Sequence, residues 1–258
     1  MTNMKSLLRT ATTATLALGL AVSPAWSEEA KTEPAETRDA KALEILKKAD
    51  EATKKVTSAR FKATSKPEGF VTQYFPAAEG RGHIAGWNGR GPEKFYGDVK
   101  GNRPGSDAGI HATGGGDGES FYVIDHIGKK GYEDMDPAVM GDAGGMLAGF
   151  GMPELVNPNA FGDELAADVV ELQGEETIAG VPCYKIHVVY AANQGKSTWY
   201  LSQEDYLPRR RTQFYESPQG TGTFTVTVSD LEVNPELDGA FYRMSLPEGY
   251  EQIDDFAP

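Results

Sequence analysis

Apolar and polar side chains alternate in short runs through the second half of this 258-residue chain. In the run from Val181 to Tyr190, for example, Tyr184, Ile186 and Val188 share one face, because successive side chains of a strand point to opposite faces. Comparable runs follow at 197–202, 209–215 and 223–229, with turn-forming residues between them. This spacing predicts an antiparallel meander.

The chain ahead of the meander predicts one long helix and further strands. Between Asp39 and Val56 apolar residues recur at intervals of three and four, which is typical of an amphipathic helix. Its apolar face must lie on the sheet, because no other apolar surface is predicted nearby. Strands are expected at 59–64, 70–75, 82–87, 94–99, 120–124 and 131–133. The glycine-rich stretch 101–118 has no periodicity and is predicted to be a mobile hairpin tip.

The segment 136–167 differs, because methionines and other apolar residues stand among glycines and prolines. Two short helices are predicted, Pro137–Ala148 and Pro158–Ala166, each with proline in its first turn. They are either a plain helical layer that closes the sheet or a movable lid over a hydrophobic cavity. Farther on, Phe241 and Leu246 are predicted to dock the C-terminal tail.

The first 27 residues have the pattern of a signal peptide. Lys5 and Arg9 precede the apolar run Ala11–Val22, and small residues lead to a cleavage site near Ser27. We therefore expect a soluble, monomeric, periplasmic protein with a flexible leader over 28–38 and a single domain over 39–258. A net charge of −13 argues against binding to nucleic acid or to an anionic membrane surface.

Residues that could carry catalysis are sparse. Cys183 is the single cysteine, which excludes an intrachain disulfide, and its strand context predicts a small apolar filler. The four histidines have no metal-ligand spacing, and we expect no metal site and no cofactor. Asp125 and His126 are adjacent strand residues that point to opposite faces, and no nucleophile motif is present. The sequence therefore predicts a protein that is not an enzyme.

A series of short motifs resembles a known family over about Asp39 to Glu251. The motifs are Ala42-Leu43-Glu44-Ile45-Leu46, Pro92–Phe95, Gly180–Tyr184, Trp199 with Leu207-Pro208-Arg209, and Phe241-Tyr242 followed by Leu246–Tyr250. Their order is similar to that of the periplasmic lipoprotein-carrier superfamily, which comprises LolA/LolB-like outer-membrane lipoprotein-sorting proteins and RseB-type stress sensors. The resemblance implies a single, strongly curved antiparallel sheet. It is an unclosed half-barrel of the α+β, mainly β class, with an N-terminal helix and short lid helices on its concave side. It also implies an apolar cavity for acyl chains and no catalytic residues.

Candidate ligand-binding residues are the bulky apolar side chains of the predicted strands and helical segment. The candidate cavity wall comprises Phe61, Tyr74, Trp87, Phe95, Tyr122, Tyr184, Ile186, Trp199, Phe224 and Val226. The candidate lid comprises Met140, Met146, Leu147 and Phe150. Within the basic cluster Arg209–Arg211, Arg209 and Arg211 either form ion pairs with acidic groups or bind a lipid head group or acidic partner.

Two functions remain open from the sequence. The protein is a carrier or binding protein for a lipid, a fatty acyl chain or a lipoprotein. Alternatively, the concave face is filled by the protein's own side chains, and the domain senses or supports the envelope through contacts with an envelope protein.

Overall fold

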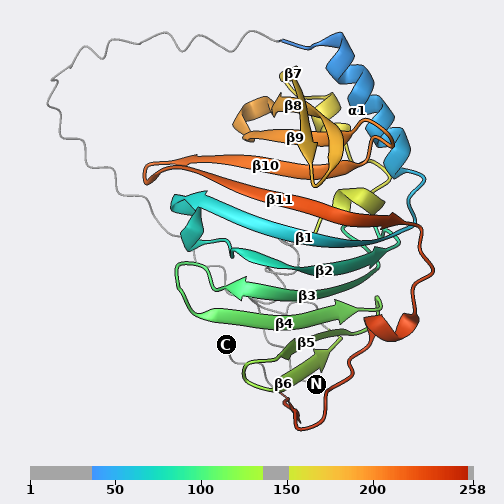
Figure 1. The fold of residues 1–258 in the computed structure, drawn as a ribbon, viewed down its shortest axis with the longest axis vertical. Helices are drawn as coiled ribbons and strands as arrows, with labels where there is room; N and C mark the ends of the chain where they lie inside the picture. The colour runs from blue at the N-terminus through green and yellow to red at the C-terminus, as the bar shows by residue number, and fades with distance from the viewer. Residues whose placement is uncertain (1–36, 136–150, 255–258) are drawn as a thin grey trace, which may run out of the picture. The chain divides into compact units, whose positions relative to one another are not determined.

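The computed structural model describes residues 37–135 and 151–254. Their strands form one twelve-stranded sheet in the order β12-β6-β5-β4-β3-β2-β1-β11-β10-β9-β8-β7, which is not closed into a barrel (Figure 1). The strands are β1 (Ser58–Gly69), β2 (Ala78–Ala85), β3 (Lys94–Asn102), β4 (Gly109–Gly116), β5 (Phe121–Asp125), β6 (Lys130–Asp134), β7 (Val169–Ile178), β8 (Val181–Val189), β9 (Lys196–Ser202), β10 (Pro208–Ser217), β11 (Gly220–Val233) and β12 (Glu251–Gln252). The expected open, mainly β, antiparallel sheet is confirmed, with β12 as a parallel exception.

The described helices are short apart from the first. They are α1 (Ala40–Thr53), η1 (Phe70–Gln73), η3 (Pro153–Val156), α3 (Gly162–Leu165), η4 (Ala191–Asn193) and η5 (Gly239–Tyr242). None of the helices in the described residues is long and apolar enough to cross a membrane. The predicted helix Pro158–Ala166 is shorter than expected, and the predicted helix Pro137–Ala148 lies outside the described residues.

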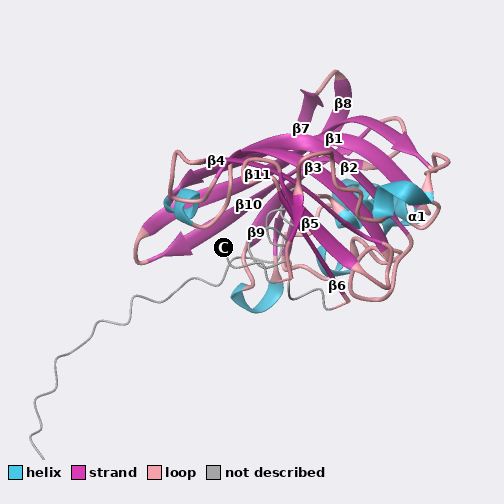
Figure 2. Ribbon diagram, turned by 90° about the horizontal axis from the view of Figure 1, so that it is seen from below, coloured by secondary structure: helices cyan, strands magenta, loops and turns pink. Residues whose placement is uncertain are grey.

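Helix α1 is confirmed where periodicity predicted it. Asp39 caps its start, because its carboxylate accepts hydrogen bonds from the backbone N–H groups of Lys41 and Ala42. The fully buried Leu46 belongs to the stripe that packs against β7, β8 and β9, where it shares a core with Trp199. Figure 2 shows the sheet bending around α1, and contacts with α1 place η3 and α3 on the same side. This covered side is called the inner face, and the opposite side the outer face.

Strand register places side chains on one face or the other. Phe61 of β1 pairs with Gly82 of β2, and the same face continues through Val226 of β11 to Trp199 of β9. Leu155 of η3 packs into the core that contains Phe61 and Val226, which makes this the inner face.

The prediction of a mobile tip over 101–118 is wrong. Its second half is strand β4, which pairs with β3 along its whole length and with β5 from Ala112 to Gly116. Aromatic rings of the next strand fill the space that the glycines leave: a Cβ atom on Gly115 would lie 2.8 Å from the Tyr122 ring, and one on Gly116 would lie 2.7 Å from the Phe121 ring. Glycine has a low intrinsic strand preference, but here packing by neighbours decides the structure.

The predicted strand 70–75 is also wrong, because this segment begins with the 3₁₀ helix η1. Gly69 ends β1 with φ of 69°, a left-handed conformation that turns the chain out of the sheet. The Thr72 hydroxyl then donates to the Gly69 carbonyl oxygen and closes the turn.

Both ends of the described chain cover an edge of the sheet. At one edge, the backbone of Asp39 donates to Val170 of β7, and Val170 donates to Thr37. At the other edge, β12 pairs with β6. Between β11 and β12, the tail 235–254 crosses the outer face through η5, where Phe241 packs against the rings of His83 and Tyr96.

Candidate functional site on the inner face

A hollow of about 500 Å³ opens on the inner face between the η3–α3 segment and strands β8 to β10. Most of its lining is polar, which differs from the apolar cavity that the sequence led us to expect. The lining residues are Trp87, Gly89, Glu154, Asn157, Asn159, Ala160, Asp163, Glu164, Tyr190, Trp199, Arg211 and Gln213.

Arg211 and Glu154 form an ion pair in the hollow. The Arg211 guanidinium donates to Glu154 Oε1, and its central carbon lies 5.4 Å from the centre of the Trp199 ring. The two paired side chains are only 18% and 14% exposed, so solvent screens this pair less than a surface pair. The second carboxylate oxygen, Glu154 Oε2, is buried without a hydrogen-bond partner in the described residues. The described residues therefore leave one acceptor of this carboxylate unsatisfied.

Glu164 anchors a second polar network. It is 5% exposed, and its Oε1 accepts hydrogen bonds from the Tyr190 hydroxyl at 2.7 Å and from Trp199 Nε1 at 3.1 Å. Burial raises the pKa of the Glu164 carboxyl, against the lowering effect of the Tyr190 hydrogen bond. Burial is also the main cause that raises the pKa of Tyr190. This network orients Trp199, whose ring forms a wall of the hollow.

The described lining contains no serine, cysteine or histidine. The arrangement is suited to binding, because it combines two indole rings, amide groups and a carboxylate with an unused acceptor. Cys183 lies elsewhere, buried beside Ile178 and Tyr200, and burial raises the pKa of its thiol to about 11. It is an inert filler, as expected.

Most of the predicted wall residues share the inner face. Those on it are Phe61, Phe95, Tyr184, Ile186, Trp199, Phe224 and Val226, with Trp87 on the loop between β2 and β3. Of these, only Trp87 and Trp199 line the hollow. Phe61, Phe224, Val226 and Ile186 are each at most 3% exposed, so they form the packed core. Contact of any of them with a ligand stays a prediction.

Two predicted wall residues lie elsewhere. Tyr74 is 56% exposed at the end of η1, where the wrongly predicted strand 70–75 would have placed it in the sheet. Tyr122 lies on the outer face, because its pairing with Gly115 sets the alternation of β5, and its hydroxyl donates to the Phe241 carbonyl oxygen at 2.8 Å. The four candidate lid residues, Met140, Met146, Leu147 and Phe150, lie outside the described residues.

Both candidate arginines are in ion pairs. Arg209 lies 2.6 Å from Asp205, and Arg211 pairs with Glu154. Only Arg211 lines the hollow, and binding of a head group or partner by either arginine stays a prediction. Glu154, Glu164 and Tyr190 were not singled out in the sequence, since nothing distinguishes two carboxylates among 38 acidic residues. The alternation predicts Tyr190 on the same face as Tyr184, Ile186 and Val188, and this signal alone could have pointed to it as a site residue.

Comparison with known proteins supports the fold. Residues 154–255, less than half of the chain, match the family described as "Predicted periplasmic protein (DUF2092)". The crystal structure of LprF from Mycobacterium bovis superimposes with a TM-score of 0.51 and 13% identity, over 83% of this chain and 99% of that one. The resemblance to the lipoprotein-carrier superfamily is confirmed at the level of the fold. No curated protein matches the sequence.

Two other solved structures are more distant. Mycobacterium tuberculosis lipoprotein LppX has a TM-score of 0.43 and 13% identity, over 78% of this chain and 99% of that one. The Pseudomonas aeruginosa MucA/MucB complex matches with a TM-score of 0.43 and 13% identity, over 80% of this chain and 62% of that one. At such identities the likeness concerns the fold alone.

Proposed function

We propose that this protein is a non-catalytic periplasmic binding protein that carries a lipid or an acylated protein, with the polar end of its ligand held in the inner-face hollow. The observation that carries the proposal is the open hollow beside Trp199 and Arg211 on an otherwise packed face. The signal-peptide pattern of the first 27 residues and the description of the matching family support a periplasmic location.

The chemistry of the hollow suits a neutral polar group. Arg211 is already paired with Glu154, and Asp163 adds a further acidic group, so a second carboxylate or phosphate would meet little uncompensated positive charge. Hydroxyl or amide donors of a ligand would instead satisfy Glu154 Oε2, while its apolar part contacts the rings of Trp87 and Trp199. Each methylene group removed from water contributes about 0.8 kcal/mol.

The test is native mass spectrometry of the protein purified from periplasm, followed by organic extraction. The variants are Arg211→Gln and, as a matched control, Arg210→Gln, since Arg210 is the next residue of β10 and points to the outer face. We expect a co-purifying lipid mass in the wild type and the control, and a reduced amount in Arg211→Gln. A clean apo mass that stays unchanged when fatty acids and a lipopeptide are offered would refute the carrier function.

A specific observation favours the second candidate, a sensing or structural module. The described inner face is filled largely by the protein's own side chains, with Phe61, Ile186 and Leu155 at most 2% exposed. Such a domain would act through contacts with an envelope protein. Site-specific crosslinking in cells from the exposed Tyr74 and Ile127 distinguishes the two candidates: a defined protein adduct together with a clean apo mass supports the module.

A further inference from the structure

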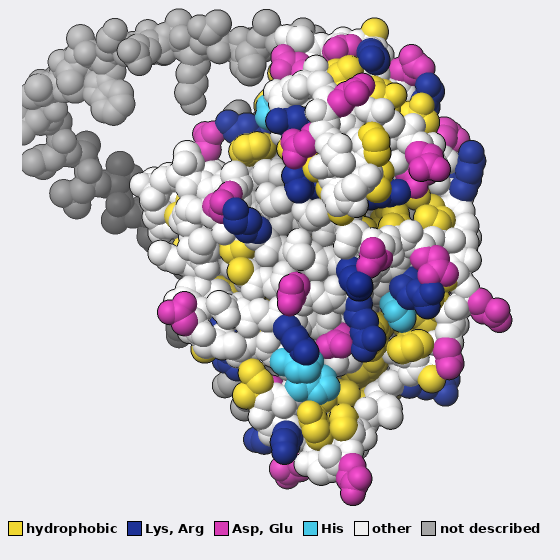
Figure 3. Space-filling view, in the orientation of Figure 1, with side chains coloured by type: hydrophobic (Ala, Val, Ile, Leu, Met, Phe, Trp, Pro, Cys, Tyr) yellow, Lys and Arg dark blue, Asp and Glu magenta, His cyan; other side chains and the backbone are white. Residues whose placement is uncertain are grey.

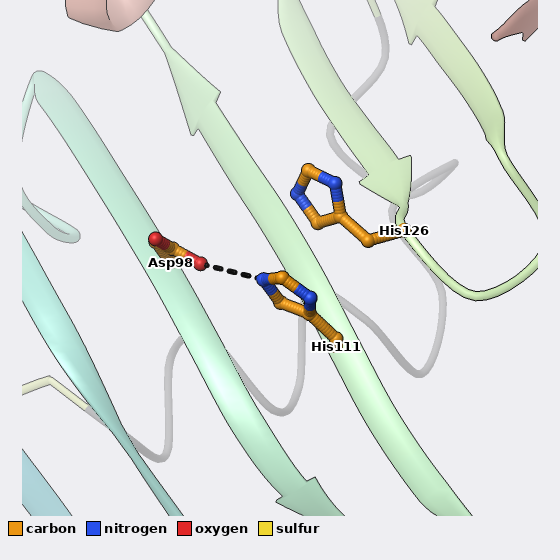
Figure 4. Close-up of side chains that lie close together, drawn as sticks. All are labelled: Asp98, His111 and His126. Carbon is orange, nitrogen blue, oxygen red and sulfur yellow. Dashed lines mark hydrogen bonds and ion pairs between the residues drawn. The ribbon is translucent and has the colours of Figure 1, made fainter. Parts of the chain in front are cut away.

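The outer face brings together three potential metal ligands from separate strands. Asp98 lies on β3, His111 on β4 and His126 directly after β5 (Figure 4). One ligand atom from each residue lies within 4.8 Å of the other two. His111 Nε2 is 3.1 Å from Asp98 Oδ1, and the two imidazole rings stack with their centres 4.1 Å apart. Figure 3 shows histidine side chains together on this face, beside basic and acidic ones.

Strand pairing explains the cluster. Lys100 pairs with His111 and Asp98 pairs with Thr113, so the carboxylate and the first imidazole are diagonal neighbours on one face. The His126 backbone N–H donates to the His111 carbonyl oxygen at 2.9 Å, which extends the β4–β5 ladder by one residue and sets the second ring beside the first. These contacts join regular strands, which are rigid supports for a site.

The atoms of Asp98 and His126 that face away from the cluster are held by other residues. Arg81 lies 3.1 Å from Asp98 Oδ2, which leaves Oδ1 directed toward His111. His126 Nδ1 lies 3.1 Å from the Tyr250 hydroxyl of the C-terminal tail, and its Nε2 lies 2.7 Å from the Thr113 hydroxyl. A proton on Nδ1 that is donated to Tyr250 places the lone pair on Nε2, as metal binding through that atom requires. Partners of this kind orient the ligands in established metal sites.

We propose that Asp98, His111 and His126 bind a divalent transition-metal ion of the zinc class, with solvent in the remaining position. Two imidazoles and one carboxylate are a ligand set that such ions prefer. Metal bonds of about 2.0–2.2 Å require the three ligand atoms to move closer together. The adjoining outer-face hollow of about 330 Å³ leaves room for His126 to turn away from Thr113.

The site is accessible, and its charges are nearly balanced. The side chains of His111 and Asp98 are 32% and 23% exposed, so a hydrated ion can reach them. Arg81 offsets the charge of Asp98, which favours moderate affinity over very tight binding. Because Tyr250 belongs to the tail, we also expect metal binding to tighten the contact of the tail with the outer face. The site is separate from the inner-face hollow, so it stands or falls independently of the proposed function.

The test uses the mature protein without a histidine tag. Zn²⁺ is titrated against a chromophoric competitor, and Co²⁺ is titrated while its visible absorption is recorded. We expect one ion per chain, and at least about tenfold weaker binding in Asp98→Asn, His111→Gln and His126→Gln. Tyr250→Phe is expected to weaken binding by about 10- to 100-fold, since it removes the partner of His126. His187→Gln is the matched control, because His187 lies on the outer face of β8, far along the sheet from β3.

A second measurement does not depend on variants. In the wild-type protein, the imidazole NMR signals of His111 and His126 should shift on addition of one equivalent of Zn²⁺, while those of His83 and His187 should stay. Equal affinity in the wild type and all three ligand variants would overturn the proposal. So would the absence of binding by the wild type, or zinc-induced shifts confined to other histidines.

Discussion

The inner face of the sheet is packed in different ways across β7–β11 and across β2–β4. Across β7 to β11, the inner face carries bulky side chains such as Trp199, Ile186 and Val226, and helices cover them. Across β2 to β4, the same face repeatedly carries glycine, as at Gly82, Gly97 and Gly114. In this part of the sheet, aromatic rings of neighbouring strands lie against Gly82, Gly115 and Gly116, and the C-terminal tail covers part of the outer face.

The comparison shows that glycine-rich sequence does not by itself indicate a loop. Gly82 lets the Phe61 ring approach β2 closely, since a Cβ atom on Gly82 would lie 2.8 Å from that ring. The β7–β11 part of the sheet is therefore sensitive to the loss of a large side chain, and the β2–β4 part is sensitive to the gain of a small one.

Removing the Trp199 ring from the β7–β11 part of the sheet should have the largest effect on stability. Trp199→Ala should lower the free energy of unfolding by about 3–5 kcal/mol, because it leaves a cavity beside α1 and removes the hydrogen bond to Glu164. Urea unfolding followed by circular dichroism measures the loss. Trp87→Ala is the control, since that ring is only partly buried at the edge of the hollow. A loss under about 1 kcal/mol at Trp199 would contradict the role given to its packing.

Adding a methyl group to the inner face of β2 should lower stability by a smaller amount. Gly82→Ala should lower the free energy of unfolding by about 1–3 kcal/mol, because the new methyl group overlaps the buried Phe61 ring. Combining it with Phe61→Leu should cost less than the sum of the two single changes. Gly91→Ala, which has no neighbour within 4 Å, should be close to neutral. Additive losses in the double variant would refute the contact.

The buried carboxyl of Glu164, which contacts Trp199, should make stability depend on pH. Because burial raises the pKa of Glu164 above 4.5, the folded state holds this proton more tightly than the unfolded state does. Its contribution to stability is therefore full below pH 4.5 and is lost as the pH rises through the raised pKa. Glu164→Gln should flatten that fall while keeping an acceptor for Tyr190. Unfolding midpoints across pH 4 to 8 test this, and equal slopes in both proteins would contradict it.

The buried imidazole of His83 on β2 should make stability depend on pH in the opposite direction. Burial, with the nearby charges of Arg60 and Arg81, lowers the pKa of His83 below 6.5. The unfolded state therefore binds the proton more readily, and stability is lost as the pH falls below 6.5. His83→Phe should remove part of this loss. The measurement is the difference in unfolding midpoint between pH 7.5 and 5.5, which should shrink relative to the wild type.

Periodicity predicted strands in both parts of the sheet, including β2, β3 and β8 to β11, but it missed β4 and β7. The helix over Asp39–Val56 and the alternating run from Val181 were correct because each carries its own apolar pattern. Strand β4 carries no such pattern, since the side chains that pack over Gly115 and Gly116 belong to β5. The order of local residues could not reveal a strand that depends on its neighbours for packing.

Because β4 was not predicted, the pairing of the two histidines, His111 and His126, was not predicted either. With 101–118 predicted to be a mobile tip, His111 has no defined neighbour, and the four histidines show no metal-ligand spacing along the sequence. The pairing of β4 with β5 brings the two rings together across a hairpin. The polar hollow could not be predicted from local patterns either. Glu154 and Glu164 reach it from short helical segments, and the position of these segments depends on contacts with α1 and the central strands.

The two covered edges of the sheet have a consequence for self-association of the folded protein. An exposed edge strand offers unpaired backbone groups that can join a second molecule and start aggregation. Here Thr37 and Asp39 cover β7, while β12 covers β6. Proteolytic trimming that reached either cover would leave the core strands in place but expose an adhesive edge. Such trimmed molecules should self-associate before they unfold.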